Sequence, residues 1–147
     1  MSVRTSIANA LVEKLKLIDG TGTFKTNIYG NAYPKLKFWD EVNDFPSIYM
    51  STGSETREYL PSAFKWGFLN ISLKLYVKNE DPAQELENLL EDVEKVIDSN
   101  RILVYDSITP GAQTTEILIN SIVTDEGLLA PYGVGEINIT VQYPVLS

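Results

Sequence analysis

The chain has 147 residues, a net charge of −8, and neither histidine nor cysteine. The missing residue types exclude disulfide bonds, zinc–thiolate sites and Ser-His-Asp or Cys-His catalysis within the chain. The acidic balance argues against nucleic-acid binding as the main task, and no apolar run reaches the roughly 18–20 residues of a membrane span. The length and the absence of a linker predict one domain over residues 1–147.

The N-terminal part predicts one helix followed by mostly irregular chain. Apolar residues recur at helical spacing through residues 4–18, with Ser2 as a possible N-cap and Asp19-Gly20 as a stop. Glycine and asparagine breakers in residues 20–35 predict a loop with at most a short strand. Further on, we expect a brief extended piece at 35–39, a strand at 47–51 and a long connection at 52–66.

The clearest signals lie in the second half of the chain. Residues 67–78 and 135–143 alternate apolar and polar side chains at a period of two, which predicts two half-buried strands. Between them a helix begins at Asp81, a good N-cap, with Pro82 at the first helical position and Gln84 completing a capping box. We also expect a short strand at 102–105, and a strand at 116–124 joined to the last one by a long tip at 125–134.

The expected order is therefore α-β-β-α-β-β. Strands joined by hairpin links pair antiparallel, and both helices need a surface for their apolar stripes. These demands predict an α+β fold in which two helices pack on one face of a mainly antiparallel four-stranded sheet with long loops.

Enzyme chemistry finds little support in the sequence. Asp40, Glu41 and Asp44 lack the spacing of a calcium loop, and no glycine-rich phosphate loop follows a strand. Paired carboxylates could serve a glycan hydrolase, but a chain with 20 acidic residues forms such pairs by accident. We expect no catalytic residues, no metal and no cofactor.

The second helix carries most of the negative charge. Residues 80–98 contain eight acidic side chains against Lys95 alone. An acidic outer face of this helix keeps a small domain soluble, or alternatively it faces DNA without binding it or meets a basic partner. The residues assigned to this acidic face are Glu85, Glu87, Glu91, Asp92 and Glu94.

Two predicted loops are unusually apolar. Contiguous apolar side chains on surface loops mark interaction sites, and aromatic residues with arginine dominate interface energetics. The alternative is that these side chains fold back and cap the open end of the core. The candidate interface residues are Arg57, Tyr59, Leu60, Phe64 and Trp66 in the first loop, and Leu128, Leu129 and Tyr132 in the second.

Strand 116–124 is apolar on both faces. Simple alternation places Ile117, Ile119 and Val123 on one face and Leu118 and Ile122 on the other. A two-layer monomer would leave the second face in water, so we expect another polypeptide to cover it. Two or more different apolar surfaces on one chain favour head-to-tail contacts between copies. Such contacts close into a ring if the rotation between neighbouring subunits permits.

The chain resembles the tail terminator (tail completion) proteins of long-tailed bacteriophages. The resemblance spans most of the length and follows the order of the elements. It is carried by residues 38–41 (Phe-Trp-Asp-Glu), residues 44–49 (Asp-Phe-Pro-Ser-Ile-Tyr), residues 53–55 (Gly-Ser-Glu), the alternating strand 69–77, residues 89–94 in the helix and the closing strand 135–143.

This resemblance implies a structural virion protein rather than an enzyme. It implies a homohexameric ring, assembled in the host cytoplasm, that caps the tail tube protein, stops its polymerisation and docks the neck or head-completion proteins at the head-proximal end. A contractile tail would add contact with the sheath protein, and DNA would pass through the lumen without sequence-specific binding. A neck or head–tail connector component and a carboxylate-dependent glycan hydrolase are the alternatives.

Overall fold

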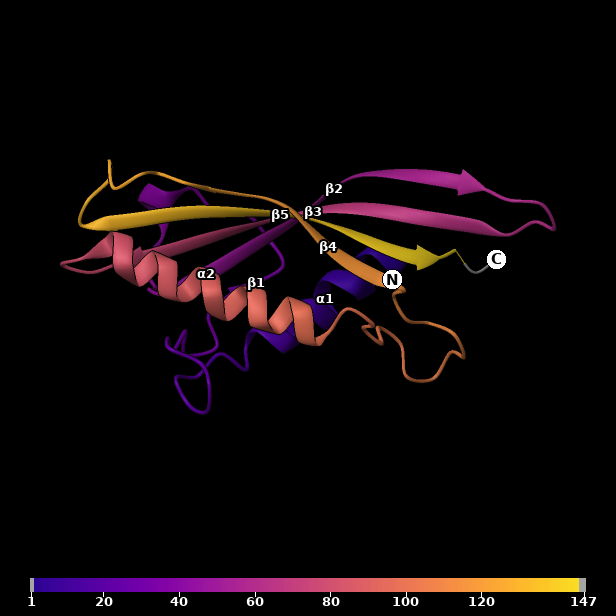
Figure 1. Cartoon of the computed structure of the whole chain (residues 1–147), viewed down its shortest axis with the longest axis horizontal. Helices are drawn as coiled ribbons and strands as arrows, with labels where there is room; N and C mark the ends of the chain where they lie inside the picture. Colours follow the sequence, from indigo (N-terminus) through magenta and orange to yellow (C-terminus); the bar gives the residue numbers. More distant parts are fainter. Residues whose placement is uncertain (1, 146–147) are drawn as a thin grey trace.

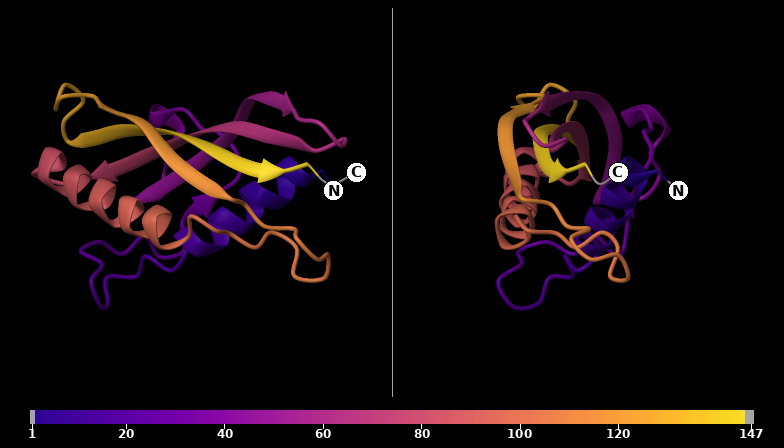
Figure 2. Two further views of the ribbon diagram at one scale, coloured as in Figure 1. Left: turned by 45° about the vertical axis from the view of Figure 1, so that its right-hand side comes forward. Right: turned by 90° about the vertical axis from the view of Figure 1, so that its right-hand side faces the viewer.

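The computed structural model describes residues 2–145. Figure 1 shows an elongated molecule in which long twisted strands run above both helices, and Figure 2 shows the sheet arching over them. The strands form one sheet in the order β1-β2-β3-β5-β4. In chain order the elements are α1 (Val3–Leu15), β1 (Ala32–Tyr33), the 3₁₀ helix η1 (Trp39–Glu41), β2 (Ser47–Tyr59), β3 (Lys65–Lys78), α2 (Pro82–Ser99), β4 (Glu116–Thr124) and β5 (Tyr132–Pro144).

The α+β class predicted from the sequence is confirmed, but the sheet differs from the expected one. It has five strands rather than four, and it is mixed, because β1 runs parallel to β2 while the other neighbours are antiparallel. The additional strand is two residues long and is preceded by a hydrogen bond from the Ile48 amide to the Asn31 carbonyl (2.8 Å). So short a strand has no alternation to detect, which is why the pattern could not place it.

The main core lies between the sheet and the helices. The apolar members of both predicted alternations are buried, from Leu69 to Val77 on β3 and from Ile137 to Tyr143 on β5. Helix α1 contacts β1 and β2, α2 contacts β3 and β5, and the helices contact each other. Burying each Leu or Ile side chain stabilises the fold by about 1.5–3 kcal/mol, so this shared core holds the five strands and both helices together.

Both helices begin at the predicted caps. The Ser2 hydroxyl accepts from the Thr5 amide (3.1 Å), and the Asp81 carboxylate accepts from the Gln84 amide (3.3 Å). A capping box would also have the Asp81 amide donate to the Gln84 side chain. Here the Asp81 amide donates to Asn79 instead, and the Gln84 side chain donates to Asn88. Helix α1 ends at Leu15 rather than at residue 18.

Neither short piece expected in the connections becomes a strand of the sheet. Residues 35–39 pair with no strand, and the chain enters the 3₁₀ helix η1 at Trp39 after Phe38, whose backbone is extended. The strand expected at 102–105 is reduced to one bridge between Val104 and Gln113. Both segments lie in long connections, and a short run of apolar residues there is a weak guide to strand pairing.

The outer face of the sheet, away from the helices, is covered at one end by the chain itself. Residues 34–46 cross this face, and the Tyr76 hydroxyl donates to the Lys37 carbonyl over 2.6 Å. The small second core formed here gathers Val42, Tyr49 and Tyr76 with Tyr33, Phe45 and Val134. The cover expected from another polypeptide concerned the second face of strand 116–124, where Leu118 remains exposed.

A β-bulge at Asn120 changes the faces predicted for strand β4. Beyond the bulge, Ile122 pairs with the buried Ile137, so its side chain lies on the helix side of the sheet. Val123 pairs with Glu136 and lies on the outer face, where it joins Leu118. The sequence assignment of these two residues was therefore reversed, while Leu118 and Val123 remain exposed on the outer face.

Candidate assembly surfaces

The segment expected to be a loop at 52–66 is a β-hairpin. Strand β2 continues to Tyr59 and pairs there with Lys65 of β3, and the Leu60 amide donates to the Phe64 carbonyl (2.8 Å) to close the turn. The loop prediction was wrong because residues 56–59 are exposed on both faces. A strand without a buried face has no reason to alternate apolar and polar residues, so its sequence lacks the period-two signal.

The hairpin has two chemically different faces. A register shift between Thr52 and Glu55 precedes it, after which Glu55, Arg57 and Tyr59 follow the helix side of the sheet. Glu55 forms an ion pair with Arg57 and accepts from the Tyr143 hydroxyl (2.8 Å). Arg57, predicted as an interface residue, is therefore held within its own strand by this pair.

Aromatic side chains gather at the end of the hairpin. The Phe64 and Trp66 rings meet edge-on with centroids 4.9 Å apart, and the Lys65 ammonium lies 5.5 Å from the centre of the Tyr59 ring. Tyr59 is 72% exposed, and Phe64 and Leu60 are exposed as well. Tyr59, Leu60, Phe64 and Trp66 together are called the hairpin tip below. They do not fold back into the core, which was the alternative considered from the sequence.

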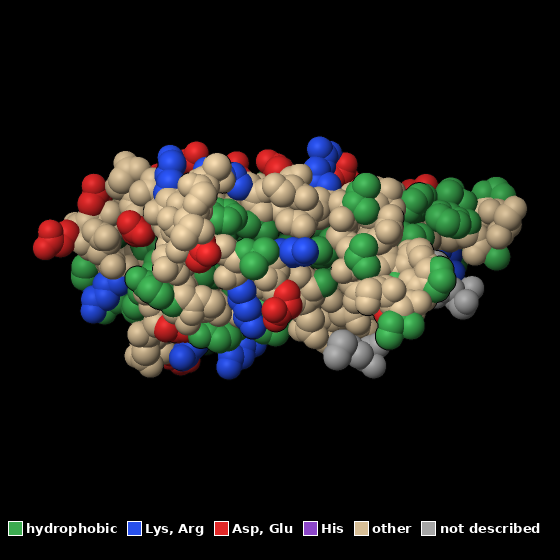
Figure 3. Space-filling model, turned by 90° about the horizontal axis from the view of Figure 1, so that it is seen from below, with side chains coloured by type: hydrophobic (Ala, Val, Ile, Leu, Met, Phe, Trp, Pro, Cys, Tyr) green, Lys and Arg blue, Asp and Glu red, His purple; other side chains and the backbone are tan. Residues whose placement is uncertain are grey.

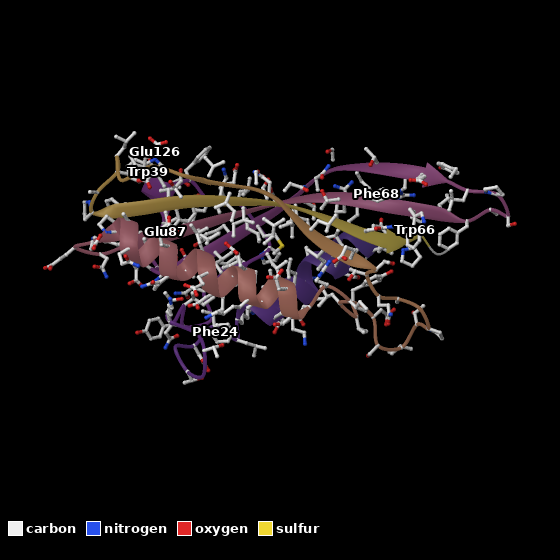
Figure 4. All side chains as sticks on the ribbon, in the orientation of Figure 1. Phe24, Trp39, Trp66, Phe68, Glu87 and Glu126 are labelled. Atoms are coloured by element: carbon white, nitrogen blue, oxygen red, sulfur yellow. The ribbon has the colours of Figure 1, made fainter. Side chains whose placement is uncertain are left out.

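The hairpin tip lies at one end of the long axis. Figures 1 and 2 show the β2–β3 hairpin extending past the end of β5, and Figure 4 places Trp66 there. The connection between α2 and β4 lies near the same end (Figure 1), and it carries Ile108, which is 89% exposed. Figure 3 shows hydrophobic side chains gathered at this end of the molecule.

The second group of predicted interface residues lies at the opposite end. Tyr132 packs against Trp39 and against Phe45 with tilted rings, each pair of ring centroids being 5.7 Å apart. Leu128 is 84% exposed at the turn between β4 and β5, whereas Leu129 is half-buried. Figure 4 shows Trp39 and Glu126 together, far from Trp66. The eight predicted residues therefore form two separate surfaces rather than one.

An apolar pocket opens beside Trp39, and the sequence analysis missed it. Its volume is about 400 Å³. One wall comes from the irregular segment around Phe38, which is 75% exposed, and the floor comes from strands β3 and β5. The cluster of apolar residues at 36–39 could have signalled it. The side chains that line this aromatic pocket include Leu36, Lys37, Phe38, Trp39, Tyr76 and Val134.

The acidic face of α2 has one member fewer than predicted. Glu85, Glu87, Glu91 and Glu94 are exposed or partly exposed, and Glu91 pairs with Lys25 (2.7 Å), whose ammonium lowers the pKa of that carboxyl. Asp92, in contrast, is 0% exposed and accepts from the amide (2.7 Å) and hydroxyl (2.6 Å) of Thr26. Asp92 therefore anchors the loop after α1 and does not face a partner.

Within 2–145, no group of three or more acidic side chains is arranged to hold a metal ion. Of the helices formed by these residues, none is long and apolar enough to cross a membrane.

Comparisons with known proteins identify related chains and a solved structure with the same fold. The family model described as Bacteriophage Tail Tube Terminator Protein matches residues 1–146. The tail tube terminator protein p142 of Escherichia phage T5 is 41% identical over 152 residues, which cover 97% of this chain and 94% of that protein. A chain of the virion of a native gene transfer agent particle has the same fold, with a TM-score of 0.63 over 98% of both chains at 10% identity.

The family match and the curated relative confirm the resemblance inferred from the sequence. They also confirm the expectation of a structural virion protein rather than an enzyme, since terminating a tail tube is an assembly role. On the family match and this identity, the chain belongs to the bacteriophage tail tube terminator protein family.

Proposed function

We propose that this chain forms a homohexameric ring on the last ring of tail tube subunits at the head-proximal end of the tail. The ring stops tube polymerisation, and its other face docks the neck or head-completion proteins, with the sheath protein as a further neighbour if the tail contracts. The observation that carries this proposal is the match of the tail tube terminator family to residues 1–146. Assembly takes place in the host cytoplasm.

The distribution of apolar surface supports a protein that acts by contact. Exposed aromatic side chains sit at the two ends of the elongated molecule, in the hairpin tip and beside Trp39. Exposed apolar groups of this kind are typical of protein interfaces. The hairpin tip with Arg57, and the surface formed by Leu128, Leu129 and Tyr132, are the proposed contacts with neighbouring subunits, tube or neck.

The acidic face of α2 suits a surface that DNA passes without binding. Glu87 and Glu91 are exposed there, and Glu85 and Glu94 are partly exposed. Like charges repel the phosphate backbone, so such a face does not retain DNA. We therefore place this face toward the lumen of the ring.

Tube-growth experiments test the capping role. Purified protein is added to polymerising tail tube protein, and tube length is measured by negative-stain microscopy. A terminator shortens the tubes and appears as a cap at one end, whereas unregulated length favours the alternative of a head–tail connector. Light scattering on the gel-filtration peak, or of protein bound to tubes, should give the mass of a hexamer. A monomer under all these conditions contradicts the proposal.

A further inference from the structure

We propose that the hairpin tip of one copy inserts into the aromatic pocket of the next copy, and that this head-to-tail contact builds the ring. The inference rests on the proposed ring and identifies the two surfaces that form it. Both are present on every chain, and Figure 4 places them at opposite ends of the molecule, with Trp66 at one and Trp39 at the other. Two different surfaces on one chain produce a heterologous contact, which closes into a ring at a suitable rotation.

The shapes of the two surfaces are complementary. The tip is a narrow projection, because only residues 60–64 connect the two strands and the Phe64 and Trp66 rings pack edge-on beside the turn. The pocket of about 400 Å³ is lined mainly by apolar atoms from Leu36, Phe38 and Val134. Clefts of roughly 300–1,000 Å³ with such linings bury compact apolar groups well.

The area available is sufficient for a ring contact. A fully buried aromatic side chain contributes roughly 150–250 Å². Tyr59 is 72% exposed, Phe64 is 42% exposed and Trp66 is half-buried, so each can add only the exposed part of that area to the contact. A standard interface buries about 800 Å² per partner, and the exposed Ile108 near the tip can add to this. The contact repeats around the ring, so a modest area at each junction suffices.

Charge gives the contact a direction. Glu58 is paired with Trp66 across the hairpin, so its carboxylate lies on the same face of the tip, and among the described residues it has no ion-pair partner. Lys37 lines the pocket and forms no ion pair within 4.0 Å among residues 2–145, although its charge also acts on Asp44 of the same segment. The pocket also contains Glu41, which can meet Lys65 of the tip, whereas its second lysine, Lys74, is already paired with Glu136. Complementary charges of this kind fix orientation more than they add affinity.

A mixing experiment tests the contact directly. The tip variant carries Tyr59→Ser, Phe64→Ser and Trp66→Ser, and the pocket variant carries Leu36→Glu and Phe38→Glu. The pocket changes affect exposed positions, and cooperative thermal unfolding checks that both variants fold. Each variant alone should be monomeric, because each lacks one of the two surfaces. Mixed together they retain one intact tip and one intact pocket. A single junction lacks the multivalency of the closed ring, so the mixture is measured at protein concentrations well above those at which the wild type forms rings. Light scattering should then report a 1:1 dimer and nothing larger.

A charge exchange provides the second measurement. Glu58→Lys or Lys37→Glu alone should weaken ring formation about five- to tenfold in the required protein concentration, and the double variant should recover most of that loss. Leu17→Ser with Tyr29→Ser removes exposed apolar groups elsewhere and should leave the rings intact.

The outcomes separate this contact from the capping role. If either the tip variant or the pocket variant still forms rings, the proposed contact is wrong, while the proposed capping function is unaffected. The same conclusion follows if the wild type forms rings but the two variants stay monomeric when mixed at concentrations well above those at which the wild-type rings form. A wild type that neither forms rings nor shortens tubes overturns both.

Discussion

The ring of Tyr143 lies directly against Gly67 on the neighbouring strand. The two residues are paired across β3 and β5, and a Cβ atom on residue 67 would stand 2.7 Å from Cε1 of Tyr143. The absent side chain lets the aromatic ring cross β3, and the Tyr143 hydroxyl then reaches Glu55 on β2 over 2.8 Å. This contact joins three strands at the base of the hairpin and fixes the direction in which the hairpin projects.

Replacing Gly67 with alanine should destabilise the domain by about 1–3 kcal/mol, because the new methyl group overlaps the Tyr143 ring and forces it to move. Urea unfolding measures the change as a lower midpoint at constant slope. Gly53→Ala is the matched control in the same strand pair, since its Cβ meets only the Asn70 carbonyl oxygen at 3.4 Å. Equal midpoints for both variants would show that the ring moves without cost.

The same tyrosine should make stability fall at high pH. Burial and the hydrogen bond to Glu55 raise the pKa of Tyr143 from 10.0 to about 12. A pKa that is higher in the folded state gives stability that is complete below the unfolded value and is lost as the pH rises through the folded one. Between pH 10 and 12 the wild type should therefore lose more stability than Tyr143→Phe. Parallel urea titrations of both proteins check this, and identical pH profiles would contradict it.

The parts of the fold that could be predicted are those with one buried face. Strands β3 and β5 and helix α2 bury one regular stripe each, and burial imposes the periods of two and 3.6 on their sequences. The hairpin at 56–59 and the short β1 are stabilised by backbone pairing without a buried stripe. Their sequences therefore show no period-two alternation of apolar and polar residues. The bulge at Asn120 places Ile122 and Val123 on the opposite sides of the sheet from those that simple alternation predicts. The alternating pattern by itself does not reveal where one extra residue is inserted in a strand.

The candidate surfaces were predicted by residue type but not by position. Tyr59, Phe64 and Leu128 are exposed, as their types and neighbours in the sequence predicted. Their separation into two ends depends on the strand order, which a single sequence does not specify. Asp92 was misplaced for a similar reason. Its four-residue spacing from Asn88 and Val96 gives no sign that the Thr26 loop folds back over it.

Asp92 should be the carboxylate whose loss costs the most stability. It accepts from the buried Thr26 amide and hydroxyl and from the part-buried Lys25 amide (3.0 Å), and its own side chain is closed to solvent. Asp92→Ala leaves these donors unsatisfied and should cost about 2–4 kcal/mol. Asp92→Asn should cost nearly as much, because its amide group turns a donor toward other donors.

Glu94→Ala on the same helix is the control for Asp92. Glu94 is partly exposed, and its replacement should change the free energy of unfolding by no more than about 0.5 kcal/mol. Chemical denaturation at neutral pH compares the three variants with the wild type. An Asp92→Ala variant as stable as Glu94→Ala would mean that the loop at residue 26 is held by its apolar neighbours alone.

Acid should weaken the second core through Asp44. Burial by itself raises the pKa of this carboxyl, but hydrogen bonds from the hydroxyls of Tyr33 (2.6 Å) and Tyr49 (3.0 Å) outweigh it, and the pKa lies below the usual 3.8. A pKa that is lower in the folded state gives stability that is present above the unfolded value and lost as the pH falls through the folded one. Asp44→Asn should therefore be less stable than the wild type at pH 7, and the difference should shrink below about pH 4. Asp40→Asn, an exposed change in the same segment, should follow the wild type throughout. Because residues 34–46 also form a wall of the aromatic pocket, a wild type that retained its full stability at pH 2.5 would show that this wall does not depend on the Asp44 carboxylate.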